Sequence, residues 1–142
     1  MTRDQILDFT ERRKDALNRH DVIGLAALYA ADCVVESPLA AGTIYGRQAV
    51  TKVHERLFEA FPDLQFDQDH VLIDGDKAAV GGTLTGNYTG GFLGLPPSGK
   101  PIRVPLAVIF RVADGEIVFE RRIYDFTGMM MQIGVLQPRS AS

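Results

Sequence analysis

The second half of the chain shows a regular alternation of apolar and polar side chains, which begins after Pro62. A repeat of two residues is typical of β-strands, because successive side chains point to opposite faces of a sheet. The alternation predicts four strands: Gln65–Ile73, Lys77–Tyr88, Ile102–Val112 and Glu116–Tyr124. Two of the connections, residues 74–76 and 113–115, are short and contain a glycine that tolerates the positive φ of a hairpin turn. We therefore predict an antiparallel meander.

The rest of the chain shows the spacing of helices instead. Apolar side chains recur at helical intervals, and Asp21 is placed to cap a short second helix. A brief strand is predicted over Val34–Pro38, where the proline stops it. The predicted helices are Arg3–Asn18, Val22–Ala30, a third that runs from Gly46 to Pro62, and Phe126–Ile133.

Helices that precede an antiparallel sheet predict the α+β class. Glycines at positions 81, 82 and 86 allow the long strands to bend strongly. A sheet bent around the N-terminal helices would form a cone with a pocket inside. The length of 142 residues favours a single domain over residues 1–142, with residues 137–142 as a frayed tail.

Composition excludes several classes of function. The formal net charge is −3 and no basic stripe is present, so neither nucleic acid nor an anionic membrane is an expected partner. The charged start of the chain does not resemble a signal peptide, and no apolar stretch is long enough to span a bilayer, so we expect the cytoplasm. One cysteine and three scattered histidines predict no disulfide and no metal site.

Two motifs resemble those of a known family. The loop GGFLGLPPSGKPI and the ending FRVADGEIVFERRIYDFTGMMMQIG are similar to segments of the SnoaL-like polyketide cyclases, within the nuclear transport factor 2-like superfamily. Asp125, Gln132 and Gly134 match the family's ending, and the resemblance covers nearly the whole chain. It implies a cone-shaped α+β barrel with a deep pocket. Related enzymes include ketosteroid isomerase and limonene epoxide hydrolase.

The resemblance also bears on the register of the last strand. Val118, Glu120, Arg122 and Tyr124 share one face, and the other face carries Ile117, Phe119, Arg121 and Ile123. Hydrophobicity alone would bury the second set. The resemblance implies the opposite, with the polar set lining the pocket. The apolar set would then face outward, where it could form a homodimer through the sheet.

Five residues are candidates for catalysis, and each has a structural alternative. Glu120 and Arg122 could orient a water or hydroxyl group, or form a surface ion pair. Asp125 could be an acid/base, or the N-cap of the last helix. His54 lies beside the apolar face of the third helix and could transfer protons or simply fill the core. Glu36 could be a pocket acid with a raised pKa, or an exposed strand-edge residue.

The remaining pocket candidates are mostly apolar. Val108 and Phe110 share one strand face, and Tyr124 ends the last strand. Tyr88 could donate a hydrogen bond to a carbonyl or enolate oxygen. Arg122 stands where the related cyclases carry an acid/base Asp, so this chain lacks that group.

Two classes of function remain open at this point. The first is a cofactor-free cyclase or isomerase that uses acid/base chemistry on an apolar or aromatic carbonyl compound, with an epoxide-hydrolase-like, water-adding enzyme as a variant. The second is a dimer that binds such a molecule without chemistry.

Overall fold

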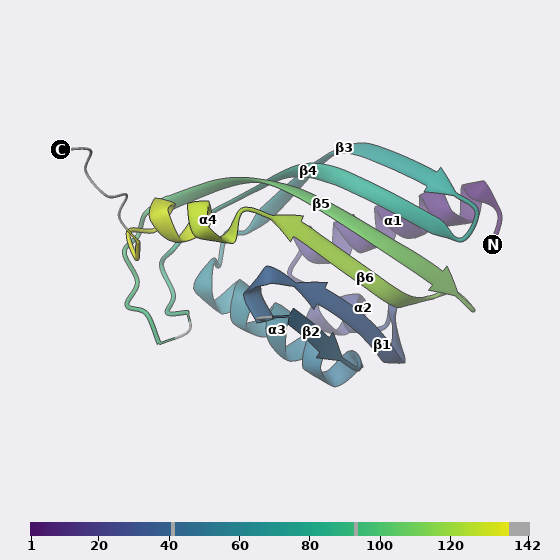
Figure 1. Ribbon diagram of the computed structural model, residues 1–142, viewed down its shortest axis with the longest axis horizontal. Coiled ribbons are helices and arrows are strands. Elements are labelled where there is room, and N and C mark those ends of the chain that lie inside the picture. The colour runs from purple at the N-terminus through teal and green to yellow at the C-terminus, as the bar shows by residue number, and fades with distance from the viewer. Residues whose placement is uncertain (41, 93, 137–142) are drawn as a thin grey trace.

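The computed structural model describes residues 1–40, 42–92 and 94–136. The predicted tail, residues 137–142, lies outside the described residues. Within these ranges, four α-helices, one 3₁₀ turn and six strands follow one another (Figure 1): α1 Arg3–Asn18, α2 Val22–Ala26, β1 Tyr29–Ser37, η1 Pro38–Ala40, β2 Gly42–Tyr45, α3 Arg47–Ala60, β3 Gln65–Asp74, β4 Lys77–Asn87, β5 Pro101–Ala113, β6 Glu116–Tyr124 and α4 Phe126–Gln132.

The predicted meander is confirmed, and it forms most of one larger sheet. The strand order is β2-β1-β6-β5-β4-β3, in which β3 to β6 pair antiparallel with their chain neighbours. β1 joins the free edge of β6 in parallel, and β2 then pairs antiparallel with β1. The sheet is strongly curved but open, with β2 and β3 as its edges, so the α+β class is confirmed but the barrel is not closed (Figure 1).

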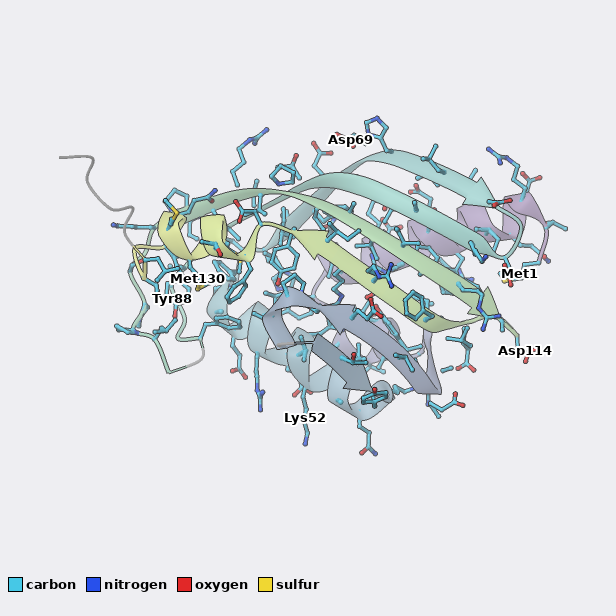
Figure 2. The ribbon with its side chains drawn as sticks, viewed as in Figure 1. Met1, Lys52, Asp69, Tyr88, Asp114 and Met130 are labelled. Atoms are coloured by element: carbon cyan, nitrogen blue, oxygen red, sulfur yellow. The ribbon has the colours of Figure 1, made fainter. Side chains whose placement is uncertain are left out.

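The three N-terminal helices lie on one side of the sheet, and α4 lies at one end of it (Figure 1). Apolar side chains of α1 and α3 meet the inward side chains of the strands in one core, which includes Phe9, Val50, Val80, Val108 and Phe110. Figure 2 shows that Asp69 points away from the helices, on the uncovered face of the sheet. Tyr88 and Met130 lie together near α4, and Asp114 marks the opposite end. The core therefore lies between the concave face of the sheet and the helices.

The second helix is shorter than predicted. It ends at Ala26, and the chain enters β1 at Tyr29, which the prediction had placed near the end of the helix. The reason is a long-range one, because Tyr29 pairs with Ile117 of β6 and the Ile117 N–H donates to the carbonyl of Leu28. Local spacing gives no sign of a parallel partner so far along the chain. β2 was not predicted either; it has only four residues and pairs antiparallel with the nearby β1.

Gly82 is the glycine that most clearly permits the bend of the sheet. A Cβ atom at Gly82 would overlap the backbone of Asp67 on β3. The register of β3 against β4 shifts between Gln68 and His70, directly beside this contact. The predicted role of glycine in bending the sheet thus applies where a bulge and a close backbone approach coincide.

The register of β6 places its polar set inward, as the resemblance implied. Glu120 is fully buried, whereas Arg121 and Ile123 are exposed on the outer face. One expectation for this strand is wrong, because Ile117 is buried rather than outward. A bulge between the pairs Arg111–Phe119 and Val112–Ile117 leaves Val118 as an extra residue. The bulge reverses the alternation at that point.

Candidate functional site

A small cavity lies between the concave face of the sheet and the helices. Its volume is about 50 Å³, which is room for a few water molecules. Four of the lining side chains carry polar groups, namely Arg13, His54, Arg122 and Tyr124. The rest of the wall is apolar and consists of Leu17, Leu39, Leu57, Leu64, Leu84, Leu106, Val108 and Met129. An apolar wall with a few convergent polar groups is typical of a small-molecule site.

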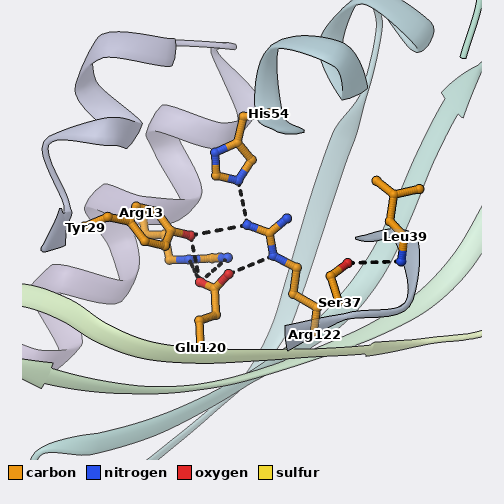
Figure 3. Close-up of polar contacts among 7 residues, drawn as sticks. All are labelled: Arg13, Tyr29, Ser37, Leu39, His54, Glu120 and Arg122. Carbon is orange, nitrogen blue, oxygen red and sulfur yellow. Dashed lines mark hydrogen bonds and ion pairs between the residues drawn. The ribbon is translucent and has the colours of Figure 1, made fainter. Parts of the chain in front are cut away.

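Glu120 is the centre of the polar cluster behind this cavity (Figure 3). Its Oε1 accepts hydrogen bonds from Arg13 Nε at 3.2 Å, Arg13 Nη2 at 3.0 Å and the Tyr29 hydroxyl at 2.8 Å. Its Oε2 accepts a hydrogen bond from Arg122 Nε at 2.7 Å. Both carboxylate oxygens are therefore occupied by strong donors from α1, β1 and β6.

The cluster keeps Glu120 ionised. Burial by itself raises the pKa of its carboxyl group, but the charges of Arg13 and Arg122 and the hydrogen bonds from Arg122 and Tyr29 outweigh burial and lower the pKa to about 2. Burial likewise lowers the pKa of both guanidinium groups, but the Glu120 charge and the contacts with Tyr29 together outweigh burial, so both pKa values are raised. Burial and the Glu120 charge raise the pKa of Tyr29 to about 12, so its hydroxyl remains a donor.

His54 joins the cluster from the helical side of the cavity (Figure 3). Its Nε2 lies 2.7 Å from Arg122 Nη2. Because a guanidinium can only donate, Nε2 accepts this bond and the ring proton lies on Nδ1. Burial, and then the Arg122 charge, holds the pKa of His54 well below its ordinary value. The imidazole is therefore neutral, with its lone pair directed at Arg122.

The structure thus brings three of the five predicted catalytic residues together. Glu120, Arg122 and His54 form one hydrogen-bonded chain at the cavity. Glu36 lies elsewhere, because it is on the outer face of β1, where its Oε2 lies 2.6 Å from Arg121 Nε. Asp125 is the N-cap of α4, and its Oδ1 accepts a hydrogen bond from the Gly128 N–H at 2.8 Å.

The predicted pocket-lining residues divide in the same way. Val108 and Tyr124 line the cavity, and burial raises the pKa of Tyr124. Phe110 and Tyr88 are buried but are not among the lining residues. The Tyr88 hydroxyl donates to the Leu95 carbonyl at 2.7 Å, inside the loop that follows β4, so it is engaged in holding that loop.

Two members of the cluster were missed in the sequence. Arg13 lies seven residues after Ile6 and four after Phe9, which places it on the apolar face of α1. A charged residue on such a face indicates a buried ion pair and could have been recognised. Tyr29 gave no comparable signal, because it lay inside a predicted helix and its place beside Glu120 depends on the parallel pairing of β1 with β6.

Arg122 and Tyr124 also form part of a second hollow. Where β1 and β6 diverge, a surface groove is lined by Glu36, Ser37 and Arg121 together with these two residues. Arg122 and Tyr124 therefore stand between the inner cavity and the outer groove.

Among residues 1–40, 42–92 and 94–136, no group of three His, Cys, Asp or Glu side chains is arranged to hold a metal ion. None of the helices in this described part of the chain is both long and apolar enough to cross a bilayer.

A curved sheet packed over N-terminal helices, with a cavity between them, defines the nuclear transport factor 2-like, or ketosteroid isomerase-like, class of protein. Within that class the chain belongs to the SnoaL-like polyketide cyclase family, whose model matches residues 8–133. The resemblance seen in the sequence is thereby confirmed. No curated protein matches the chain significantly.

Solved structures support the same assignment. A protein of Jannaschia sp. CCS1, proposed to be a SnoaL-like polyketide cyclase, is 26% identical with a TM-score of 0.83, over 95% of this chain and 94% of that one. IdmH of Streptomyces antibioticus, proposed to be a polyketide cyclase, is 29% identical with a TM-score of 0.76, over 90% and 97%. A protein of Catenulispora acidiphila DSM 44928 with a ketosteroid isomerase-like fold, in complex with trimethylamine, shares the fold at 19% identity, with a TM-score of 0.77 over 90% and 93%.

Proposed function

We propose that this chain is a cofactor-free cyclase or isomerase that moves a proton next to the carbonyl group of an apolar or aromatic small molecule. The observation that carries the proposal is the 2.7 Å contact between Arg122 Nη2 and His54 Nε2 at the wall of an apolar cavity. It sets a permanent positive charge beside a neutral imidazole, in a wall that is otherwise mostly apolar.

Each partner of that contact has a role. A substrate carbonyl oxygen would accept a hydrogen bond from Arg122, whose charge stabilises the enolate oxygen as the neighbouring C–H bond breaks. As the guanidinium turns to the carbonyl, the Nε2 lone pair of His54 becomes free to take the proton. The enolate carbon can then attack a second carbonyl group, which closes a ring, or be protonated at another position, which gives an isomer.

Glu120 is a positioning residue in this scheme. Its four hydrogen bonds from Arg13, Tyr29 and Arg122, and its pKa of about 2, make it a poor proton acceptor. It instead anchors Arg122 at the cavity through the hydrogen bond from Arg122 Nε. Both carboxylate oxygens of Glu120 already accept hydrogen bonds. This disfavours the water-adding alternative, because an epoxide-hydrolase-like reaction needs a carboxylate with a free oxygen to orient the water.

Exchange of α-protons tests the proposal without knowledge of the natural substrate. Acetophenone and other aryl methyl ketones are incubated with the protein in D₂O, and loss of the methyl proton signal is followed by NMR. We expect exchange above the buffer rate, and a fall of roughly 10²-fold or more in His54→Ala. Exchange at the buffer rate for every ketone, or an unchanged rate in His54→Ala, would contradict the proposed chemistry.

The pH profile of this exchange offers a second readout. Because the pKa of His54 is held well below its ordinary value of 6.5, the base stays neutral at mildly acidic pH. We expect the exchange rate to remain level as the pH falls through 6.5 and to decline only at lower pH. A decline centred on the ordinary histidine value would show that a different, solvent-exposed group is the base.

A non-catalytic binding protein is the second candidate. It is favoured by one observation, that Glu120 and the His54 Nε2 are both hydrogen-bonded to neighbouring side chains. This candidate predicts that ligands raise the melting temperature and are recovered chemically unchanged, as mass spectrometry can establish.

We further propose that the uncovered face of the sheet binds a second copy of the chain. Ile109 on β5 and Ile123 on β6 are 39% and 50% exposed on that face, and Leu72 is 68% exposed on β3, beyond β4. A lysine at position 123 would put a charge into this apolar surface. Sedimentation should therefore show a dimer for the wild-type protein and a monomer for Ile123→Lys, whereas a wild-type monomer would contradict the assignment.

A further inference from the structure

The charges around the cavity do not balance. Arg13 and Arg122 contribute two positive charges and Glu120 one negative charge, which leaves a net charge of one positive unit. The side chains of all three are almost completely shielded from solvent, with exposures of 5%, 9% and 0%. Neither of the two carboxylates considered as site residues elsewhere compensates this charge, because Glu36 pairs with Arg121 on the outer face and Asp125 caps α4.

The two guanidinium groups also have donors to spare. Arg13 uses Nε and Nη2, and Arg122 uses Nε and Nη2, in their contacts with Glu120, Tyr29 and His54. In the described part of the chain, neither Nη1 makes a hydrogen bond, and no completely buried side-chain nitrogen or oxygen lacks a partner. Each Nη1 therefore has accessible surface. Both side chains line the cavity, and Arg122 also lines the outer groove, so the unused N–H groups belong to residues of the cavity wall.

We infer that the cavity binds a ligand with one negatively charged oxygen group, either a carboxylate or an ionised enol or phenol, against Arg13 and Arg122. Such a group would accept the spare N–H donors and neutralise the excess charge, as buried charges in proteins generally require. The leucines, Val108 and Met129 that form the rest of the wall would move apart to hold the apolar remainder of the ligand, because the cavity as it stands has a volume of only about 50 Å³. The inference deepens the proposed function, because it takes the same cavity as the binding site and specifies the class of substrate.

Two probes of matched shape test this on the wild-type protein. Benzoate and benzamide differ in charge but hardly in size, and their affinities can be compared by calorimetry at pH 7. We expect benzoate to bind roughly tenfold or more tightly than benzamide. 4-Nitrophenol absorbs visible light only as its phenolate, so addition of protein should increase that absorbance at a pH where the free probe is mostly neutral.

The benzoate comparison and the 4-nitrophenol measurement together identify which kind of negatively charged oxygen group the site prefers. A benzoate preference alone assigns the site to carboxylates, and phenolate formation alone assigns it to ionised enols or phenols; either result supports the inference. Equal or tighter binding of benzamide together with no phenolate signal, or no binding of any probe, would overturn it.

Two variants should shift the ratio of benzoate affinity to benzamide affinity in opposite directions. A simple loss of structure cannot produce opposite shifts. Arg13→Met removes the excess charge and should abolish the preference for benzoate, whereas Glu120→Gln adds to the excess and should increase it. Arg121→Gln, a neighbouring arginine on the outer face, should leave the preference unchanged. If either cluster variant fails to fold, the comparison on the wild-type protein still decides the matter.

The outcome is separable from that of the proposed function. Anion binding needs no turnover, so a benzoate preference without ketone exchange would support this inference and contradict the enzyme. Ketone exchange that depends on His54, with no preference for anions, would support the enzyme and contradict this inference.

Discussion

At the scale of single residues, Glu120 is the centre of the buried polar cluster. It is an uncharacteristic residue for the interior, and it is kept there by donors from three different elements. The contacts that hold Arg122 in place also make the carboxylate important for the stability of the fold, because its removal would leave two buried positive charges close together.

Glu120→Gln should therefore destabilise the protein by about 3 to 5 kcal/mol, as measured by urea unfolding. Glu36→Gln is the matched control, since Glu36 also pairs with an arginine but is 39% exposed, and it should cost less than about 1 kcal/mol. Equal costs for the two substitutions would contradict the central place given to Glu120.

For Asp125, substitutions can separate the candidate acid/base role from the structural role of helix N-cap. As the N-cap of α4 it accepts a hydrogen bond from the Gly128 N–H, so Asp125→Ala should cost about 1 kcal/mol in the free energy of unfolding. Asp125→Asn keeps the cap and should retain both stability and ketone exchange. If the asparagine variant stays stable but loses exchange, Asp125 is part of the chemistry.

At the scale of elements, the sequence predicts those features that depend on short-range spacing. The hairpins of β3 to β6 follow from alternation and from glycine in the turns, and the cap of α4 follows from the position of Asp125. The pairing of β1 with β6 could not be predicted, because it joins segments about 90 residues apart, such as Tyr29 and Ile117.

The same distinction applies to the site. Glu120 and Arg122 were recognised because a separation of two residues puts them on one strand face. Arg13 could have been recognised from its position on the apolar face of α1. The place of Tyr29 beside the carboxylate, and the outer position of Glu36, both depend on how β1 packs against β6, which its own sequence does not specify.

The bend of the sheet gives a prediction at this scale. Gly82→Ala should destabilise the protein by about 1 to 3 kcal/mol, because the added methyl group overlaps the Asp67 backbone. Gly81→Ala is the control, since its Cβ would meet only the Cβ of His70, at 3.6 Å. Urea unfolding of both variants checks this, and a smaller loss for Gly82→Ala than for Gly81→Ala would contradict it.

At the scale of the whole molecule, the buried cluster makes stability depend on pH. Glu120 has a pKa of about 2 in the folded chain against an ordinary value of 4.5, so its contribution is complete above pH 4.5 and is lost as the pH falls toward 2. The shift corresponds to about 3 kcal/mol. His54 acts in the same direction, because its lowered pKa makes stability decline once the pH falls below 6.5.

Urea unfolding at a series of pH values should show this loss in two steps, first below pH 6.5 and then below pH 4.5. The curve of Glu120→Gln should lack the second step and approach the wild-type curve in strong acid. Curves that stay parallel throughout would mean that Glu120 titrates alike in the folded and unfolded chains.

The hydrogen bond from Arg13 to Glu120 joins residues that are 107 positions apart. During synthesis, α1 leaves the ribosome long before β6 exists, and domains complete their folding only when the required partners have emerged. Until then Arg13 and Tyr29 have no carboxylate to bind, and β1 has no central strand to pair with. The cavity can therefore form only after β6 has been synthesised, and a chain that stops before β6 holds neither the site nor the middle of the sheet.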